Sequence, residues 1–305
     1  MPTVENEKID YRKYLKPEVV SRLKNMHLRA RLVVEGFITG LHRSPYHGFS
    51  VEFSEYRQYM PGDEIRHIDW KVYGKTNRFY IKQFEEETNL KSYLLLDASG
   101  SMGYSSHNIT KLEYASYLAA ALTYLMIEQR DAVGLITFDK KIQKYLPPRS
   151  VKSYLPQILR ELEQTKCSQI TDIANTFHEM AERIHRRGLI VILSDLYDEP
   201  ENVISGLKHF RHKKHEVIVF HILDPMEINF NFKRNALFKD METGEELTTQ
   251  PWHIKAEYKK RVRNFIENYK RQCRLNRIDY VSLDTSQQFD YALMEYLIKR
   301  KRIGG

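Results

Sequence analysis

Four short, uninterrupted apolar runs constrain the fold of this chain more than any other feature. They lie at Leu94–Leu96, Val133–Ile136, Ile190–Leu193 and Val217–Phe220, and segments with helical spacing separate them. A strand that is apolar on both sides suits a sheet whose two faces are both covered, and alternating strands and helices are typical of a parallel sheet. We therefore expect an α/β fold with a doubly wound, mostly parallel sheet, which a last strand at Ile278–Leu283 completes.

The rest of the pattern divides the chain in two. Residues 10–35 have the spacing of an amphipathic helix, Gly36 and Gly40 then interrupt it, and residues 49–90 resemble short strands and turns. We predict a small helix-plus-strand module over 1–90 and a larger α/β domain over 91–305. Within the larger domain, the segment Lys111–Gln129 is apolar nearly all round and should form a buried helix. A hairpin insertion is expected near 224–250.

Composition narrows the class of protein. A hydrophobic content of 42% over 305 residues is ordinary for a globular chain. No apolar run is long enough to span a bilayer, and the N-terminal residues lack the basic-then-apolar order of a signal peptide. Only Cys167 and Cys273 are present, which argues against a disulfide framework or a cysteine-based zinc site. We expect a cytoplasmic protein.

The chain is basic, and the charge is concentrated near one end. The net charge is +8, and residues 251–305 hold 13 Lys and Arg against 6 Asp and Glu. A basic patch can bind nucleic acid or an anionic membrane, but it is more often a solvated helix face or a surface for an acidic partner. Because no nucleic-acid recognition motif accompanies the charge, we do not expect nucleic acid to be a principal partner.

Oxygen-bearing side chains follow the expected strands. Asp97, Ser99 and Ser101 come directly after the first strand, Asp195 ends the third, and Thr171 lies at the start of the helix between them. A parallel α/β sheet would bring these five residues together at its carboxyl edge, where such folds bind ligands. Two carboxylates and three hydroxyls, with water, suit Mg²⁺ or Mn²⁺. Taken singly, the same residues could be ordinary caps and turn residues.

The order of these residues resembles a known metal site. The segment Asp97-Ala98-Ser99-Gly100-Ser101 is similar to the DxSxS motif of von Willebrand factor A-type domains, and Thr171 and Asp195 match the second and third metal loops of that family. The resemblance implies a metal-ion-dependent adhesion site. Ser99, Ser101 and Thr171 would then be direct ligands, the two aspartates would act directly or through water, and a partner carboxylate would fill the open position. Small glycines often precede the threonine in relatives, whereas Gln169-Ile170 stand here, so Asp172 is an alternative to Thr171.

The preceding segment resembles a narrower family. The stretch from Glu52 to Trp70, with Pro61-Gly62-Asp63 inside it, is similar to the hallmark of the bacterial family called domain of unknown function fifty-eight. The resemblance covers roughly residues 15–225 and includes His221-Ile222-Leu223-Asp224-Pro225. Members join this stretch to a von Willebrand A-like domain and are often encoded beside MoxR-type AAA+ ATPases. The resemblance therefore implies a protein partner, namely such an ATPase or its client.

Two functions from different classes fit these residues. The first is a metal-dependent protein-interaction subunit or adaptor that is not an enzyme. The alternative is a divalent-metal-dependent hydrolase that uses the same strand-end oxygens. Ser101 lies in a near match to the GxSxG nucleophile elbow, but Ser99 replaces the first glycine of that motif. His221 is the only candidate for the histidine base that such a hydrolase needs. The chain has no GxxxxGK[ST] loop, so we do not expect it to hydrolyse nucleotides itself.

Overall fold

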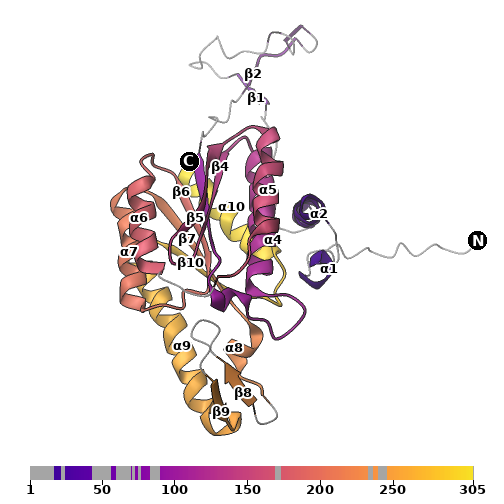
Figure 1. Ribbon diagram of the computed structural model, residues 1–305. Helices are drawn as coiled ribbons and strands as arrows, with labels where there is room; N and C mark the ends of the chain where they lie inside the picture. The colour runs from indigo at the N-terminus through magenta and orange to yellow at the C-terminus, as the bar shows by residue number, and fades with distance from the viewer. Residues whose placement is uncertain are drawn as a thin grey trace, which may run out of the picture.

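The computed structural model describes residues 17–21, 25–42, 56–59, 70, 73–74, 77–82, 90–168, 173–232, 236–239 and 246–304. A six-stranded sheet lies at its centre (Figure 1). Strands β3 (Lys91–Asp97), β4 (Ala132–Phe138), β6 (Leu189–Ser194), β7 (Glu216–Leu223) and β10 (Asp279–Asp284) are parallel, and β5 (Ile142–Arg149) pairs antiparallel with β4 at one edge. The prediction of a doubly wound, mostly parallel sheet is confirmed.

The strand order explains where a site can form. Across the sheet the order is β5-β4-β3-β6-β7-β10. If these six strands are renumbered along the chain, the order across the sheet is 3-2-1-4-5-6. This is the doubly wound arrangement, in which the strand order reverses between the first and fourth strands, β3 and β6. This switch point lies between the neighbouring strands β3 and β6, where Leu96 of β3 is paired with Leu193 of β6 just before both strands end. The carboxyl ends of β3 and β6 therefore lie side by side.

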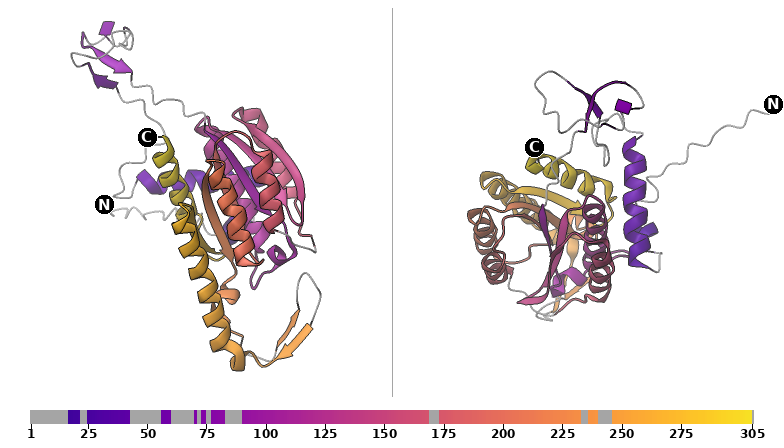
Figure 2. Two further views of the ribbon diagram at one scale, coloured as in Figure 1. Left: turned by 90° about the vertical axis from the view of Figure 1, so that its left-hand side faces the viewer. Right: turned by 90° about the horizontal axis from the view of Figure 1, so that it is seen from above.

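Helices cover both faces of the sheet, as the views in Figure 2 show. One face packs against α4 (Lys111–Glu128), α5 (Leu155–Gln164) and α10 (Asp290–Gly304), and the other against α6 (Ile173–Arg183), α7 (Pro200–His212) and α9 (Pro251–Leu275). The buried hydrophobic residues form two clusters, because side chains alternate between the two faces along each strand: Leu94 and Leu96 belong to one cluster, and Tyr93 and Leu95 to the other.

Helix α4 confirms the expectation of a buried central helix. Its N-cap residue is Thr110, whose side chain accepts a hydrogen bond from the backbone of Glu113. The Glu113 carboxylate in turn accepts a hydrogen bond from the backbone of Thr110. This capping box satisfies two of the free backbone donors at the helix start. Of its eighteen residues, all but Glu113, Tyr124 and Glu128 are buried. The apolar side chains around Leu118 lie between the sheet and α2 (Met26–His42).

The N-terminal part differs from the prediction of one helix over 10–35. The described residues of this region form two helices, α1 (Pro17–Ser21) and α2, and α2 continues through Gly36 and Gly40 to His42. A helical glycine costs only about 1 kcal/mol, and the burial of Ala30, Val33 and Phe37 against α4 outweighs that cost. The short strands β1 (Tyr56–Gln58) and β2 (Tyr80–Lys82) form an antiparallel pair. Pro61-Gly62 lies outside the described residues.

A segment between β7 and α9 extends beyond the carboxyl edge of the sheet (Figure 1). It contains α8 (Pro225–Asn229) and the antiparallel strands β8 (Ala236–Lys239) and β9 (Glu246–Thr249), in the region where the sequence predicts a hairpin. Stacked and tilted rings of Phe230, Phe238 and Tyr258 join this segment to α9. We call the described residues of 224–250 the arm.

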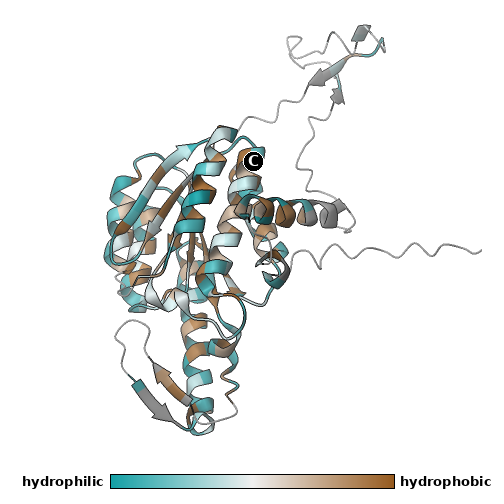
Figure 3. Ribbon diagram, turned by 45° about the vertical axis from the view of Figure 1, so that its right-hand side comes forward, coloured by the Kyte–Doolittle hydropathy of each residue, from teal (hydrophilic) through white to brown (hydrophobic). Residues whose placement is uncertain are grey.

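The distribution of hydropathy follows these layers. In Figure 3 apolar residues gather on the strands in the middle of the sheet, while α5 and α9 carry hydrophilic residues on their outer sides. No helix in the described ranges combines the length and the apolar character needed to cross a membrane.

Candidate metal centre

The expected site residues of β3 lie at its carboxyl end, next to the end of β6. Asp97 is the last residue of β3, and Ser99 precedes a short 3-10 helix, η3 (Gly100–Gly103). Asp97 and Ser99 are fully buried, and Ser101 is half-buried. The backbone holds this turn in place, because the Ala98 amide donates to the carbonyl of Phe138 at the end of β4 (2.7 Å).

Both oxygens of Asp97 already accept hydrogen bonds. The backbone amide of Ser99 donates to Oδ1 at 2.9 Å, and the Ser194 hydroxyl donates to Oδ2 at 2.6 Å. Ser194 is the last residue of β6, and its Oγ also accepts from the amide of Leu196 at 2.9 Å. Asp97 therefore ties the ends of the two central strands together.

The two serines of the DxSxS segment have a separation that suits a small cation. Ser99 Oγ and Ser101 Oγ are 3.1 Å apart. Octahedral Mg²⁺ binds oxygens at 2.0–2.1 Å, which places neighbouring ligand atoms about 3 Å apart. The same spacing also allows a hydrogen bond between the two hydroxyls. The pair is thus compatible with adjacent positions around Mg²⁺ or Mn²⁺.

Asp195 follows β6 and is held by a lysine that the sequence did not single out. Lys111 Nζ donates to Asp195 Oδ2 at 2.7 Å and to Glu227 Oε1 on α8 at 2.7 Å. The side chains of Lys111 and Asp195 are both fully buried. The ammonium also lies 4.7 Å from the centre of the Tyr197 ring, within range of a cation–π contact. Asp195 Oδ1 accepts from the amide of Tyr197 at 3.3 Å.

The position of Lys111 is energetically unusual. It is the first residue of α4, where the helix dipole disfavours a positive charge, and it is completely buried. Burial lowers its pKa, but the carboxylates of Asp195 and Glu227 outweigh burial, so the pKa lies above the ordinary value. Lys111 is therefore a permanent cation at the carboxyl edge of the sheet.

The charge of Lys111 alone does not balance the carboxylates at this edge of the sheet. Asp97, Asp195 and Glu227 would carry three negative charges against the one positive charge of Lys111. Burial, and then the charge of Asp195, raise the pKa of Asp97 to about 7. Burial also raises the pKa of Glu227 above its ordinary value. A divalent cation would supply the two positive charges that this group of four side chains lacks.

The second metal loop lies outside the described residues. Thr171 and the alternative Asp172 both fall within 169–172, so their assignment stays a prediction. The described residues on either side of this gap are tied to the same edge of the sheet. The Ser168 amide donates to the carbonyl of Ala98 at 2.8 Å, and the Ile173 amide donates to Asp198 Oδ2 at 3.0 Å.

His221, the base that a hydrolase would require, has no free nitrogen. Its Nε2 lies 2.8 Å from the backbone oxygen of Asp195, and its Nδ1 contacts the hydroxyl of Tyr280. Burial lowers the pKa of His221 to about 4, so the ring is neutral at pH 7. The side chain is fully buried among the rings of Phe265 and Tyr269. His221 therefore helps to pack the end of β7 and does not activate Ser101.

The donor set fits a hard cation, although it is not a ready-made cluster. Within the described ranges, no three His, Cys, Asp or Glu side chains converge to form a metal-binding group. The expected site instead combines hydroxyls with carboxylates, and one of its five residues lies in 169–172. Asp97, Ser99, Ser101 and Asp195 do lie together at the switch point, with two serine oxygens at ligand spacing and an excess of negative charge. These observations fit Mg²⁺ or Mn²⁺.

Sequence reasoning missed Ser194, Lys111 and Glu227. Ser194 could have been found from the parallel register, because it ends the strand beside Asp97. Lys111 carried a weaker signal: a lysine directly after the N-cap Thr110 opposes the helix dipole and begins an apolar helix. Glu227 is 116 residues from Lys111 in sequence, and nothing local marks their contact.

Together, the strand order and the helices on both faces of the sheet define a von Willebrand A-like α/β domain preceded by a helical segment. Residues 55–268 match the family described as "Protein of unknown function DUF58", which is more than half of the chain. The chain belongs to this family, as its resemblance predicted.

Relatives from mycobacteria are similar over most of the chain. The "Uncharacterized protein Rv1480" of Mycobacterium tuberculosis (strain ATCC 25618 / H37Rv) is 26% identical over 231 residues, which cover 75% of this chain and 72% of the relative. The "Uncharacterized protein Mb1516" of Mycobacterium bovis has the same identity and coverage.

Solved structures show more distant similarity. The BatB protein of Bacteroides thetaiotaomicron is 18% identical with a TM-score of 0.48, over 70% of this chain and 98% of that chain. An aerotolerance-related membrane protein of Bacteroides fragilis NCTC 9343 is also 18% identical, with a TM-score of 0.48 over 69% of this chain and 99% of that chain. The SpRpn10 VWA domain is 12% identical, with a TM-score of 0.38 over 68% of this chain and 94% of that chain.

Proposed function

We propose that this protein is a metal-dependent protein-interaction subunit that binds a carboxylate of its partner through a Mg²⁺ or Mn²⁺ ion at the carboxyl edge of the sheet. Asp97, Ser99, Ser101, Thr171 and Asp195 would hold the ion. When bound, the ion would supply a Lewis-acidic site for an anionic ligand. The observation that carries the proposal is a group of three carboxylates, two of them (Asp97 and Asp195) fully buried, with the single ammonium of Lys111, close to two serine hydroxyls at ligand spacing.

The hydrogen bonds at this edge favour a carboxylate from outside. Both oxygens of Asp97 accept bonds from protein groups, and Asp195 Oδ2 is bound to Lys111. The serine hydroxyls are neutral, so an ion bound by them would keep much of its charge. An Asp or Glu side chain of a partner would balance that charge, and the arm beside the site would offer further contact area.

Family membership suggests the partner. Members of this family are often encoded beside MoxR-type AAA+ ATPases, so we propose such an ATPase or its client as the protein bound. A cytoplasmic location would suit this partnership, and neither Cys167 nor Cys273 is in a disulfide. The hydrolase alternative gains no support, because His221 has both ring nitrogens occupied.

Two measurements, made one after the other, test this function. Isothermal titration calorimetry with MgCl₂ or MnCl₂ should detect binding to the wild-type chain, and Asp97→Ala should weaken it strongly while the circular dichroism spectrum is kept. Purified MoxR-type ATPase from the same organism should then bind the immobilised protein with Mg²⁺ but not with EDTA or after Ser99→Ala. Unchanged metal affinity in Asp97→Ala would refute the metal site. Equal capture of the ATPase in EDTA and by Ser99→Ala would refute its role in the interaction.

A further inference from the structure

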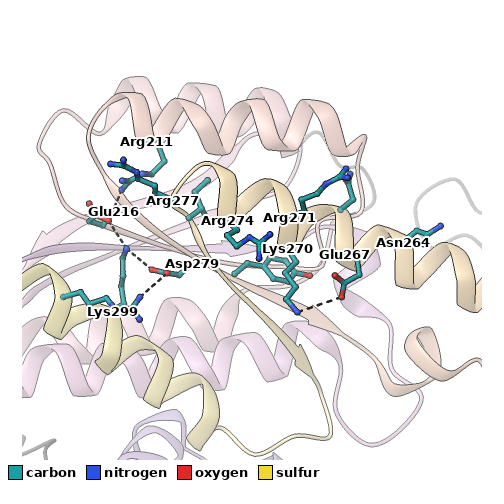
Figure 4. Close-up of a pocket in the computed structure, with 14 residues that line it drawn as sticks. Arg211, Glu216, Asn264, Glu267, Lys270, Arg271, Arg274, Arg277, Asp279 and Lys299 are labelled. Atoms are coloured by element: carbon teal, nitrogen blue, oxygen red, sulfur yellow. Dashed lines mark hydrogen bonds and ion pairs between the residues drawn. The ribbon is translucent and has the colours of Figure 1, made fainter.

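A second charged feature lies at the opposite end of the sheet from the candidate metal centre. An open cleft of about 1220 Å³ is formed by the last turns of α9, the end of α7, the start of β10 and the end of α10 (Figure 4). Its floor includes Glu216 and Asp279, the first residues of β7 and β10. Asp97 and Asp195 lie at the other ends of parallel strands. Since β7 has eight residues, the two regions are about 25 Å apart.

The lining of the cleft has an excess of positive charge. Seven Lys and Arg side chains line it against three Asp and Glu. The two carboxylates on its floor are already neutralised. Glu216 lies 2.8 Å from Lys299 and 2.9 Å from Arg211, and Asp279 lies 2.8 Å from Lys299 and 3.7 Å from Arg302. Most of the positive charge that remains belongs to the wall formed by the end of α9 and the turn after it.

That wall carries exposed cations that lack a carboxylate partner. Within the described part of the chain, the Arg271 guanidinium donates to the side-chain oxygen of Asn268 at 3.1 Å and has no carboxylate partner, and neither Arg274 nor Arg277 has an ion-pair partner. Lys270 is 4.0 Å from Glu267. Figure 4 shows these side chains following one another along the end of α9 and the turn beyond it.

The close spacing of these cations is electrostatically unfavourable unless an anion binds between them. Lys270 and Arg274 are four residues apart on the helix, and Arg271 and Arg274 are three apart, so like charges are neighbours on its surface. A helix C-terminus favours a cation in its last turn, which accounts for Arg274. It does not account for Arg277, which lies beyond the helix in a left-handed conformation with φ of 56°. An anionic ligand would relieve the repulsion between them.

We propose that this cleft binds an acidic peptide segment of a protein partner, and that it does so independently of the metal. Guanidinium groups bind carboxylates in a bidentate manner, so separate Asp or Glu side chains could each engage one arginine. A continuous phosphate backbone fits less well, because the cations without a carboxylate partner in the described chain are confined to the short stretch Arg271–Arg277, and the other charged residues of the lining are in ion pairs. The one aromatic ring in the lining, Tyr280, packs against the ring of His221 and the core cluster behind it, so it does not offer a free stacking platform.

A pair of matched variants tests this surface. The probe is a fluorescein-labelled peptide of ten glutamates, measured by fluorescence anisotropy at 150 mM salt in EDTA. We expect Arg274→Glu/Arg277→Glu to weaken binding at least tenfold. Lys260→Glu/Arg263→Glu is the control, because it changes the same charge with the same spacing on exposed positions of α9 outside the cleft. It should stay within threefold of the wild type.

Three outcomes would overturn the proposal. The first is no binding of the peptide by the wild-type chain. The second is an equal loss in both double variants, which would mean that net charge alone attracts the peptide. The third is tighter binding of a 20-base-pair DNA duplex with the same dependence on Arg274 and Arg277, which would assign the cleft to nucleic acid. Because EDTA is present throughout, failure here leaves the proposed metal site untouched, and failure of the metal site leaves this binding intact.

Discussion

Replacing Lys111 with methionine tests the charge balance at the carboxyl edge of the sheet. The substitution keeps the length of the side chain and removes the ammonium that pairs with Asp195 and Glu227, each at 2.7 Å. Removing one member of a buried ion pair costs about 3–5 kcal/mol, because the remaining charge is left without compensation. Lys111 serves two carboxylates, so we expect a loss of stability toward the upper end of that range.

The loss can be measured by thermal and urea unfolding. In EDTA, a destabilisation of this size should lower Tm by about 10 °C, since 1 kcal/mol corresponds to roughly 2 °C for a chain of this size. Adding Mg²⁺ should raise the Tm of Lys111→Met by more than that of the wild type. In this variant the ammonium that pairs with Asp195 and Glu227 is gone, so within the described cluster the bound ion alone would balance Asp97, Asp195 and Glu227.

Two controls make the result interpretable. Lys152→Met removes an exposed pair with Glu128 (2.9 Å) and should cost less than about 1 kcal/mol. Lys111→Met combined with Asp195→Asn should recover part of the stability, because it removes both charges of the pair. If Lys111→Met costs no more than Lys152→Met, and Mg²⁺ stabilises it no better than the wild type, the buried ammonium does not balance this site.

Two further predictions concern Asp97. Its folded-state pKa of about 7 lies above the ordinary 3.8, so the native chain keeps a proton that the unfolded chain has lost, and the stability contributed by this group falls as pH rises from about 4 to 7. Because the metal competes with that proton, calorimetry should find Mg²⁺ binding about tenfold weaker at pH 6 than at pH 8, and equal affinities would contradict this. Ser194→Ala should lower the unfolding free energy in urea by about 1–3 kcal/mol, since Asp97 loses a buried donor. The matched control, Ser92→Ala, removes a hydroxyl with no hydrogen-bond partner in the described structure from the other end of β3 and should cost less.

The layers of the fold were predictable because they depend on patterns within single elements. Runs such as Ile190–Leu193 are apolar on both sides only when helices cover both faces of the sheet, and the apolar helix after Thr110 has room only in the core. The end of the first long helix was not predictable in the same way. Gly36 is a local signal to stop, but α2 continues because its apolar side packs against α4, and sequence spacing alone does not reveal that contact.

The candidate site was predictable only in part, for a related reason. Asp97, Ser99 and Ser101 are close in sequence, and the parallel strand order brings Asp195 to them. Ser194, Lys111 and Glu227 act through contacts between distant elements: the Ser194 hydroxyl meets Asp97 across 97 residues, and Lys111 meets Asp195 across 84.

The contacts of Lys111 also explain why the arm belongs to this edge of the sheet. Glu227 shares its carboxylate between Lys111 Nζ and the amide of Asp224, at 2.7 and 2.8 Å. Asp224 in turn accepts from the amide of Ser106, in the loop that follows the two serines. Hydrogen bonds therefore run from the end of β6 through Lys111 to α8 and back to the loop after β3. Under the proposed function, binding of an ion at this edge would act on both the loop and the base of the arm through these hydrogen bonds.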